Sequence, residues 1–159
     1  MEMENVTLCF CITDDSVLLA EKKVGFGAGK LNGFGGKVKA GETTEEATLR
    51  ELREESGLVG KAADLTQVAL LNFYFQNVLR FTCLVYTLNQ WTGTPQETAE
   101  MKKAELFKCS ELPFGTSLFW SADELWLPHV LRGETITANI FYNAAGTGVE
   151  AFTLEKTVF

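Results

Sequence analysis

Three glutamates at helical spacing carry the most informative chemistry in this sequence. Glu51, Glu54 and Glu55 stand at positions i, i+3 and i+4 of segment 44–56, which we expect to be a helix, so their carboxylates lie on one face. Three like charges side by side repel one another, and a bound cation relieves that repulsion. Ligands that are all oxygen favour a hard ion such as Mg²⁺ or Mn²⁺ over zinc. Such ions commonly bridge protein carboxylates and substrate phosphates, so the spacing indicates chemistry on a phosphate.

Signals that begin and end a helix flank these glutamates. Thr43 or Thr44 can cap the start, acidic residues occupy the first turn, and Gly57 can adopt the left-handed conformation that ends the helix. Upstream lie two glycine-rich runs, GFGAG at 25–29 and GFGG at 33–36. Glycine lets the main chain approach a ligand closely. A carbonyl there could reach the metal, and Lys37 could reach a phosphate.

An ordinary solvated helix is the competing interpretation of segment 44–56. Glu46 and Arg50 would then form an i,i+4 ion pair with no further role. The glycine runs, Glu42, Arg50 and the terminal Gly57 together favour the metal site. In that site we expect Arg50 to be a structural partner of loop carboxylates and not a catalyst.

Composition limits the classes of protein to consider. The chain has 159 residues, of which 46% are hydrophobic, enough for one well-packed domain over 1–159 and short for two. A net charge of −7 argues against a nucleic-acid polymer or an anionic membrane as the main partner. A small nucleotide remains compatible, because a metal would mask the carboxylates. The start MEMENVTLCF lacks the features of a signal peptide, and no stretch has the length of a transmembrane helix. We expect a cytoplasmic monomer.

The cysteines and the single histidine suggest no further site. No C-x-x-C or Cys/His zinc spacing occurs, so we interpret the cysteines as buried free thiols of a reducing cytosol: Cys9, Cys11, Cys83 and Cys109. His129 follows Pro128 in an apolar run, and we interpret it as structural.

The pattern along the chain predicts an α/β fold. We expect strands over 6–12, 16–21, 67–75, 78–88, 105–109, 135–142 and 149–154, an extended glycine-rich segment over 30–38, and helices over 44–56 and 121–131. Turns are expected at 13–15, 76–77 and 143–148, and a chain break at 93–95. Strands mixed with two helices imply an α/β/α sandwich around a mixed sheet.

The segment 36–58 resembles the signature of the Nudix hydrolase family. It satisfies G-x5-E-x7-R-E-U-x-E-E-x-G-U, where U is a bulky aliphatic, at Gly36, Glu42, Arg50, Glu51, Leu52, Glu54, Glu55, Gly57 and Leu58. So many specified residues at fixed spacing rarely coincide by chance. A wider resemblance, to the MutT-homologue type that acts on oxidised purine nucleoside triphosphates, runs over most of the chain. It includes the residues at 22–29, 32–38, 93–95 and 100–101, and 120 with 126–128.

The resemblance implies a Nudix fold and a set of functional positions. Glu51, Glu54 and Glu55 match the catalytic glutamates, with Glu55 as the principal metal ligand; Gly35, through its carbonyl, and Glu100 complete the metal site, which takes Mg²⁺ or alternatively Mn²⁺. The implied substrate-binding residues are Thr7, Lys22, Phe26, Asn32, Phe34, Lys37, Phe73, Trp120 and Asp123. Among these, the Asn32 amide can both donate and accept at a purine edge, and Trp120 offers a stacking face. Core packing is the alternative for the aromatic residues, and a turn hydrogen bond for Asn32.

One departure from the family pattern affects base selection. Where the family has Trp-Pro-Asp-Asp, this chain has Trp120-Ser121-Ala122-Asp123, so Ala122 replaces the first aspartate. Loss of a hydrogen-bonding partner for the base would cost on the order of 1–3 kcal/mol. Glu124 could substitute if the loop shifts, but Ser121 and Glu124 also fit a helix capping box.

Three functions follow, in order of preference. The first is Mg²⁺-dependent hydrolysis of a modified purine nucleoside triphosphate to monophosphate and pyrophosphate, in sanitation of the nucleotide pool. The second keeps the site but takes another nucleoside diphosphate derivative, such as ADP-ribose or a dinucleoside polyphosphate. The third is a non-catalytic nucleotide-binding module, which usually lacks a signature glutamate, whereas this chain retains them all.

Overall fold

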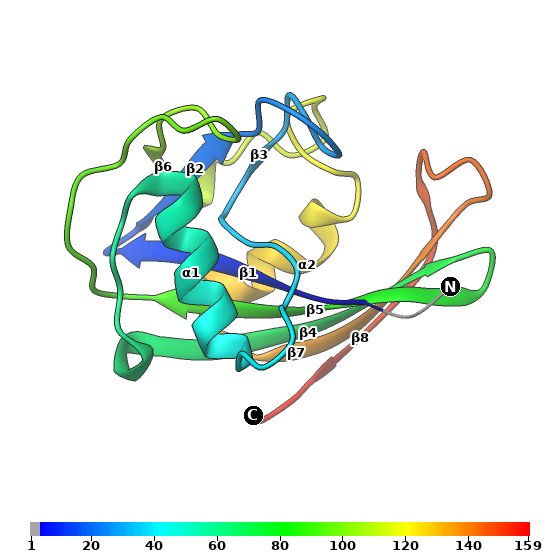
Figure 1. Cartoon of the computed structure of the whole chain (residues 1–159). Coiled ribbons are helices and arrows are strands. Elements are labelled where there is room, and N and C mark those ends of the chain that lie inside the picture. The colour runs from blue at the N-terminus through cyan, green and yellow to red at the C-terminus, as the bar shows by residue number, and fades with distance from the viewer. Residues whose placement is uncertain (1–3) are drawn as a thin grey trace.

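The computed structural model describes residues 4–159, which form a twisted sheet with one helix on each face (Figure 1). In chain order the elements are β1 (Glu4–Thr13), β2 (Ser16–Glu21), β3 (Leu31–Asn32), α1 (Thr44–Ser56), the 3₁₀ helix η1 (Ala62–Asp64), β4 (Leu65–Phe75), β5 (Val78–Leu88), β6 (Glu105–Lys108), the 3₁₀ helix η2 (Cys109–Glu111), α2 (Asp123–Leu131), β7 (Ile136–Tyr142) and β8 (Val149–Lys156).

The sheet is mixed. Its strand order is β3-β2-β1-β5-β4-β7-β8, with β6 paired to the side of β2. The β1–β5 and β4–β7 pairs are parallel, and the other pairs are antiparallel. The expected α/β/α sandwich with a mixed sheet is therefore confirmed.

Strand β1 shows how the sequence builds two cores, because both of its faces are buried. Phe10 points to the α2 side, where its ring centroid lies 6.0 Å from that of Trp126. Cys9 and Cys11 point to the α1 side and pack in a second cluster with Leu52. Fully burying a side chain such as Phe or Leu contributes roughly 1.5–3 kcal/mol. The helices are thus held on opposite faces of one strand.

Helix α1 begins and ends as its sequence predicts. The Thr43 side chain accepts a hydrogen bond from the Glu46 backbone N–H at 3.1 Å, and Gly57 closes the helix with a φ of 79°. Among residues 4–159, no helix is long and apolar enough to cross a membrane.

The second helix starts later than predicted, and the reason is local. The Asp123 carboxylate accepts a hydrogen bond from the Trp120 backbone N–H at 3.1 Å, and α2 begins at Asp123. The cap position is occupied by Ala122, which makes no side-chain cap hydrogen bond, so the capping box of Ser121 with Glu124 is not formed. The predicted extended segment over 30–38 reduces to the two-residue strand β3 and single bridges to β1 at Phe34 and Lys37.

Two long hairpins, β4–β5 and β7–β8, reach past the helices (Figure 1). Gln76 and Asn77 form the first tip with φ angles of 52° and 59°, as a two-residue turn requires. Next to that tip, Phe73 and Phe81 face each other across the strands with ring centroids 4.5 Å apart. These hairpins provide a wall on which aromatic side chains can line a binding site.

The cysteines and the histidine lie in structural settings. Cys9, Cys11 and Cys83 are buried, whereas Cys109 is only half-buried, so the prediction of full burial is wrong for Cys109. His129 places its Nδ1 atom 2.9 Å from the Glu134 carboxylate at the end of α2.

Candidate active site

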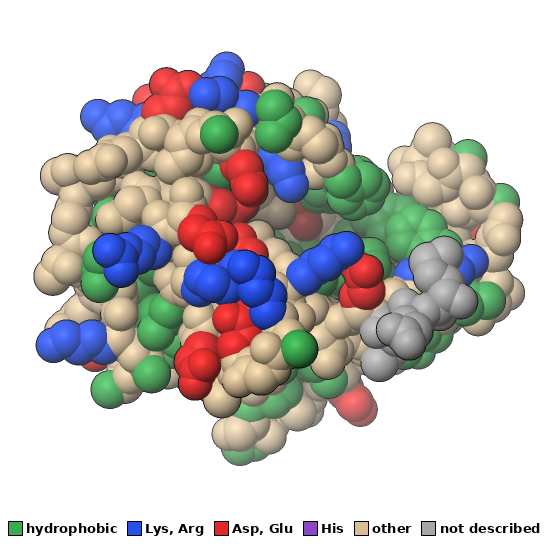
Figure 2. Space-filling model, in the orientation of Figure 1, with side chains coloured by type: hydrophobic (Ala, Val, Ile, Leu, Met, Phe, Trp, Pro, Cys, Tyr) green, Lys and Arg blue, Asp and Glu red, His purple; other side chains and the backbone are tan. Residues whose placement is uncertain are grey.

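The three glutamates of α1 line one cleft. Figure 2 shows acidic and basic side chains gathered beside a hollow on this face of the molecule. The environments of the three glutamates differ. The Glu54 side chain is 53% exposed and that of Glu51 is 14% exposed. Glu55 is buried, and the Gly35 backbone N–H donates a hydrogen bond to its Oε1 atom at 2.8 Å. The Glu54 carboxylate is therefore accessible to a ligand, while that of Glu55 is held in place.

The glycine-rich loop fits against both β1 and α1, and only glycine is small enough there. A Cβ atom on Gly35 would lie 1.8 Å from the Thr7 carbonyl oxygen, and one on Gly36 would lie 2.5 Å from Glu51 Oε1. The Thr7 backbone N–H donates to the Gly36 carbonyl at 2.9 Å. This close approach brings the main chain at Gly35 into contact with the acidic face of α1.

Arg50 joins the loop to the helix. Its Nη2 and Nε atoms donate to the two carboxylate oxygens of Glu42 at 2.7 and 3.0 Å, and Nη2 also donates to the Lys37 carbonyl at 3.0 Å. Its Nη1 atom donates to Glu51 at 2.8 Å. The hydrogen bonds from Arg50 lower the pKa of Glu42 to about 2. The predicted pairing of Arg50 with a loop carboxylate is confirmed by these contacts.

Glu100 reaches the site from a distant loop that is fixed at both ends. The Lys23 backbone N–H donates to the Glu100 carbonyl at 2.8 Å, and the Lys23 ammonium donates to Glu97 at 2.7 Å and to the Thr98 carbonyl at 3.0 Å. The Thr98 hydroxyl donates to the Glu55 carbonyl at 3.1 Å. The Glu100 carboxyl is thereby placed beside that of Glu55.

The electrostatics of Glu55 match a cation site. Burial raises the pKa of Glu55 to about 8; the Gly35 N–H opposes this shift, and the nearby carboxylates of Glu100 and Glu51 add to it. Within residues 4–159, no three acidic, cysteine or histidine side chains converge as a ready-made metal site. Arg50 contacts both Glu51 and Glu54. The donors are nonetheless all oxygen, which fits a hard divalent ion.

A cleft of about 870 Å³ runs from these carboxylates to the start of α2. Basic side chains from Lys22, Lys37 and Lys39 line it near the glutamates, where a polyphosphate would need them. The structure brings together on its walls all but one of the substrate-binding residues that the resemblance implies: Thr7, Lys22, Phe26, Asn32, Lys37, Phe73, Trp120 and Asp123.

Phe34 is the exception, and the prediction that it binds substrate is wrong. Its side chain is fully buried in the α1-side core with Leu52 and Leu58 and does not line the cleft. Two backbone hydrogen bonds with Cys9, at 2.6 and 3.0 Å, fix this orientation. The aromatic ring packs the loop against the core, while the flanking glycines face the site.

The far end of the cleft contains polar groups in an apolar setting. Burial raises the pKa of Asp123 to about 7, and the Trp120 N–H, the Trp126 indole and the Lys30 charge reduce the shift. Two buried polar atoms, Trp126 Nε1 and Thr7 Oγ1, have no hydrogen-bond partner within residues 4–159. The Trp126 indole lies near Asp123 but outside hydrogen-bond geometry. A buried polar atom without a partner costs about 1–3 kcal/mol. A ligand that bonded these atoms would recover that free energy.

Aromatic side chains cover the entrance to this end. The Phe26 ring stacks on Trp120 with centroids 4.9 Å apart and planes 27° apart, although Phe26 is 76% exposed. Gly27 permits the contact, because a Cβ atom there would lie 3.2 Å from the indole. The Asn32 Oδ1 atom accepts a hydrogen bond from the Gly33 N–H at 2.9 Å, which leaves the amide nitrogen as the group that can donate to a ligand.

Four further aromatic residues line the cleft that the sequence interpretation did not include as site residues: Phe75, Phe81, Trp126 and Tyr142. Phe75 stacks on Tyr142 with centroids 5.1 Å apart. The alternation of strand β4 could have identified Phe75, since it lies on the same face as Phe73. Tyr142 comes from β7, which no local pattern connects with the site.

The fold, the glycine loop and the acid-lined cleft define a hydrolase of the Nudix class. The NUDIX domain profile matches residues 3–129, and the chain belongs to the Nudix hydrolase family. Nudix hydrolases generally require a divalent metal and act on small nucleotides.

The chain is also similar to particular members of the family. The chain is 40% identical to the oxidized purine nucleoside triphosphate hydrolase of Danio rerio over 128 residues, which cover 80% of this chain and 79% of that protein. It is 39% identical to the enzyme of the same name from Mus musculus over 127 residues, 79% of this chain and 78% of that protein. The crystal structure of a MutT protein from Bacillus halodurans has the same fold, with a TM-score of 0.80 at 22% identity, covering 96% of this chain and 98% of that one.

Proposed function

We propose that the protein hydrolyses oxidised or otherwise modified purine nucleoside triphosphates to the monophosphate and pyrophosphate, with Mg²⁺ as the cofactor and Mn²⁺ as an alternative, and so cleans the nucleotide pool. The observation that carries this proposal is the cleft itself. It joins a cluster of carboxylates at one end to a deep aromatic and hydrogen-bonding end at the other. The similarity to two oxidized purine nucleoside triphosphate hydrolases supports the choice of substrate.

The residues at the acidic end would hold the metal and the phosphates. Glu55 is the principal candidate ligand, with the Gly35 carbonyl, Glu51, Glu54 and Glu100 around it. The bound ion would neutralise phosphate charge and favour ionisation of the attacking water. The chain's own task is to hold these oxygens against the polyphosphate. Lys22 and Lys37 would attract the phosphate tail toward them.

The far end of the cleft would select the base. Trp120 and Phe26 offer stacking faces, and Phe73 completes an apolar wall. Asn32 can donate from its amide nitrogen, Thr7 can donate or accept, and Asp123 can accept when ionised. These groups suit a flat heterocycle with several hydrogen-bonding atoms, which describes an oxidised purine.

A second candidate substrate class has one observation in its favour. Ala122 stands where the family pattern has an aspartate, and it is buried in the core at 1% exposure. With one carboxyl fewer for the base, the site depends more on its phosphate end. Another nucleoside diphosphate derivative, such as ADP-ribose or a dinucleoside polyphosphate, is the alternative substrate.

We also propose that residues 1–159 form a single domain that acts as a cytoplasmic monomer without a nucleic-acid or membrane partner. The net charge of −7 supports this proposal. Light scattering coupled to gel filtration would test it, since a mass of twice 17.6 kDa would contradict the monomer.

The direct test is product analysis. The purified protein with Mg²⁺ is offered 8-oxo-dGTP, 2-hydroxy-dATP, O6-methyl-dGTP, dGTP and ADP-ribose in parallel. We expect monophosphate and inorganic pyrophosphate in equal amounts, with the highest kcat/KM on a modified triphosphate. Release of single phosphate would contradict the mechanism, and equal rates on damaged and normal nucleotides would contradict the sanitation role. Preferred turnover of ADP-ribose would establish the alternative.

A further inference from the structure

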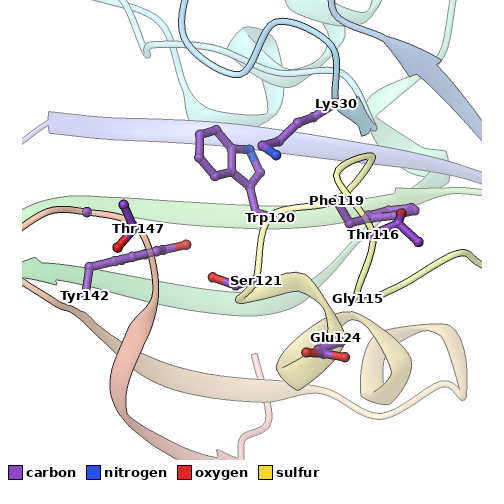
Figure 3. A pocket seen from close by; sticks show the side chains of 10 residues that line it. Lys30, Gly115, Thr116, Phe119, Trp120, Ser121, Glu124, Tyr142 and Thr147 are labelled. Atoms are coloured by element: carbon purple, nitrogen blue, oxygen red, sulfur yellow. The ribbon is translucent and has the colours of Figure 1, made fainter.

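A second cavity adjoins the far end of the cleft. It has a volume of about 460 Å³ and shares three lining residues with the cleft, namely Trp120, Tyr142 and Gly146 (Figure 3). Its size falls within the range of small-ligand sites, roughly 300–1,000 Å³. We call it the side cavity. The shared residues place the side cavity directly beside the far end of the cleft.

The walls of the side cavity are aromatic, and its rim is polar. Phe119, Trp120 and Tyr142 provide apolar surface. At the rim, the Lys30 ammonium donates to the Ser117 carbonyl at 3.0 Å and lies 5.0 Å from the centroid of the Trp120 ring. Glu124 is exposed at the other side and has no ion-pair partner within residues 4–159. An apolar group would fit between the rings, while the charges at the rim stay in water.

Asp123 fixes which part of a bound base faces this cavity. Its carboxylate accepts a hydrogen bond from the Trp120 backbone N–H, and Asp123 lines the far end of the cleft together with Trp120 and Tyr142. A base whose hydrogen-bonding edge meets Asp123 would therefore direct the substituent on its exocyclic atom past Trp120 and Tyr142. Gly146, without a side chain, leaves that passage open.

We propose that the side cavity receives a bulky apolar substituent, such as an arylmethyl or alkyl group, on the exocyclic atom of a purine base. This inference rests on the proposed function and extends it from small modifications of the purine to bulky apolar ones. Tyr142, Gly146 and Thr147, which lie beyond residues 3–129 matched by the family profile, would help to admit such substrates.

The test compares two substrates that differ by one ring. We expect the wild-type protein to hydrolyse O6-benzyl-dGTP and O6-methyl-dGTP with kcat/KM values that differ by no more than about threefold. Glu124→Trp should fill the side cavity and lower the ratio of the benzyl to the methyl value at least about tenfold, because a pocket that excludes a ring discriminates by at least that much. Glu124→Gln removes the same charge without the bulk and should keep the ratio. Ser121→Phe provides a second blocked variant, at another lining residue near the start of α2.

Binding of the products separates this inference from the proposed function. Calorimetric Kd values for O6-benzyl-dGMP and O6-methyl-dGMP require no turnover and should show the same dependence on Glu124→Trp. The inference would be overturned if the ratio of the benzyl to the methyl compound were equal in the wild type, Glu124→Trp and Ser121→Phe. It would also be overturned if the wild type did not bind the benzyl compounds. If the wild type released no pyrophosphate, but Glu124→Trp still changed the ratio of the two Kd values, only the proposed function would be overturned.

Discussion

The two ends of the cleft are built in different ways. At the acidic end, Glu51, Glu54 and Glu55 come from one helix, and Arg50 ties that helix to the loop before it. At the far end, the side chains come from β1, β4, β5, β7 and the start of α2, and they are held by packing with few hydrogen bonds. Local spacing therefore sets the phosphate chemistry, whereas tertiary packing sets base selection. Base selection can consequently change while the phosphate chemistry stays the same. Ala122 is such a change.

The largest effect should come from the acidic end. Glu55→Gln keeps the size of the side chain and an acceptor for the Gly35 N–H, but it removes the charge that would bind the metal. We expect kcat to fall about 10³-fold. Pyrophosphate release under saturating Mg²⁺ measures this loss. Retained turnover would contradict the metal assignment, and circular dichroism serves as the check on folding.

The same substitution should stabilise the metal-free protein, which a merely damaging mutation would not do. The folded-state pKa of Glu55 is raised from 4.5 to about 8, so between these pH values the folded protein binds more protons than the unfolded chain. Stability therefore falls as the pH rises through that window. Glu55→Gln removes this term. In EDTA the Tm of the variant should exceed that of the wild type at pH 8, and the difference should shrink toward pH 5.

The link between loop and helix should rank second. Arg50→Met removes the ion pairs to Glu42 and Glu51 and releases the Lys37 carbonyl. Misplacement of catalytic groups by about 1 Å can cost roughly 10² in rate, and we expect a loss of that order in kcat/KM. Arg53→Met is the matched control, since Arg53 lies exposed on the same helix. If both variants lost activity equally, a general effect on α1 would explain the result.

The acidic end of the cleft could be predicted from the sequence more completely than the far end. The bounds of α1, its Thr43 cap and the role of Arg50 follow from residues within fifteen positions of one another in the chain. Glu100 and Trp120 lie far from them, and only the family resemblance connected them with the site. The β-prone runs and the turn residues between them predicted the hairpins, and the combination of strands with two helices predicted the mixed sheet.

The errors arose where tertiary contacts decide orientation. Phe34 lies between glycines that line the cleft, yet hydrogen bonds to Cys9 turn its ring into the core. Helix α2 starts later than predicted because the buried Asp123 carboxylate accepts a hydrogen bond from the Trp120 backbone N–H. Tyr142 joins the site through the parallel β4–β7 pairing, a long-range contact that local patterns do not contain.

At the far end, Asp123→Asn should change base selection more than turnover. The pKa of Asp123 is raised to about 7, so the carboxyl is mostly protonated below that pH and ionised above it. Only the ionised form accepts two hydrogen bonds from a guanine edge, so kcat/KM for 8-oxo-dGTP should rise with pH through about 7. Asp123→Asn should flatten this rise and lower kcat/KM about tenfold, as loss of one buried hydrogen bond implies. An unchanged inflection would assign the titration to another group.

The smallest effect should come from Phe26, and its direction distinguishes two roles. Phe26 is 76% exposed and stacks on Trp120, so Phe26→Ala should leave Tm nearly unchanged. If Phe26 covers a bound base, its loss raises KM by about threefold, in line with a stacking contact of 0.5–1.5 kcal/mol. If it instead competes with the base for the indole face, KM falls. We expect the rise, because Phe26 and Trp120 both line the cleft and a base bound there can contact both rings. Val24→Ala, on the same loop, controls for loop flexibility.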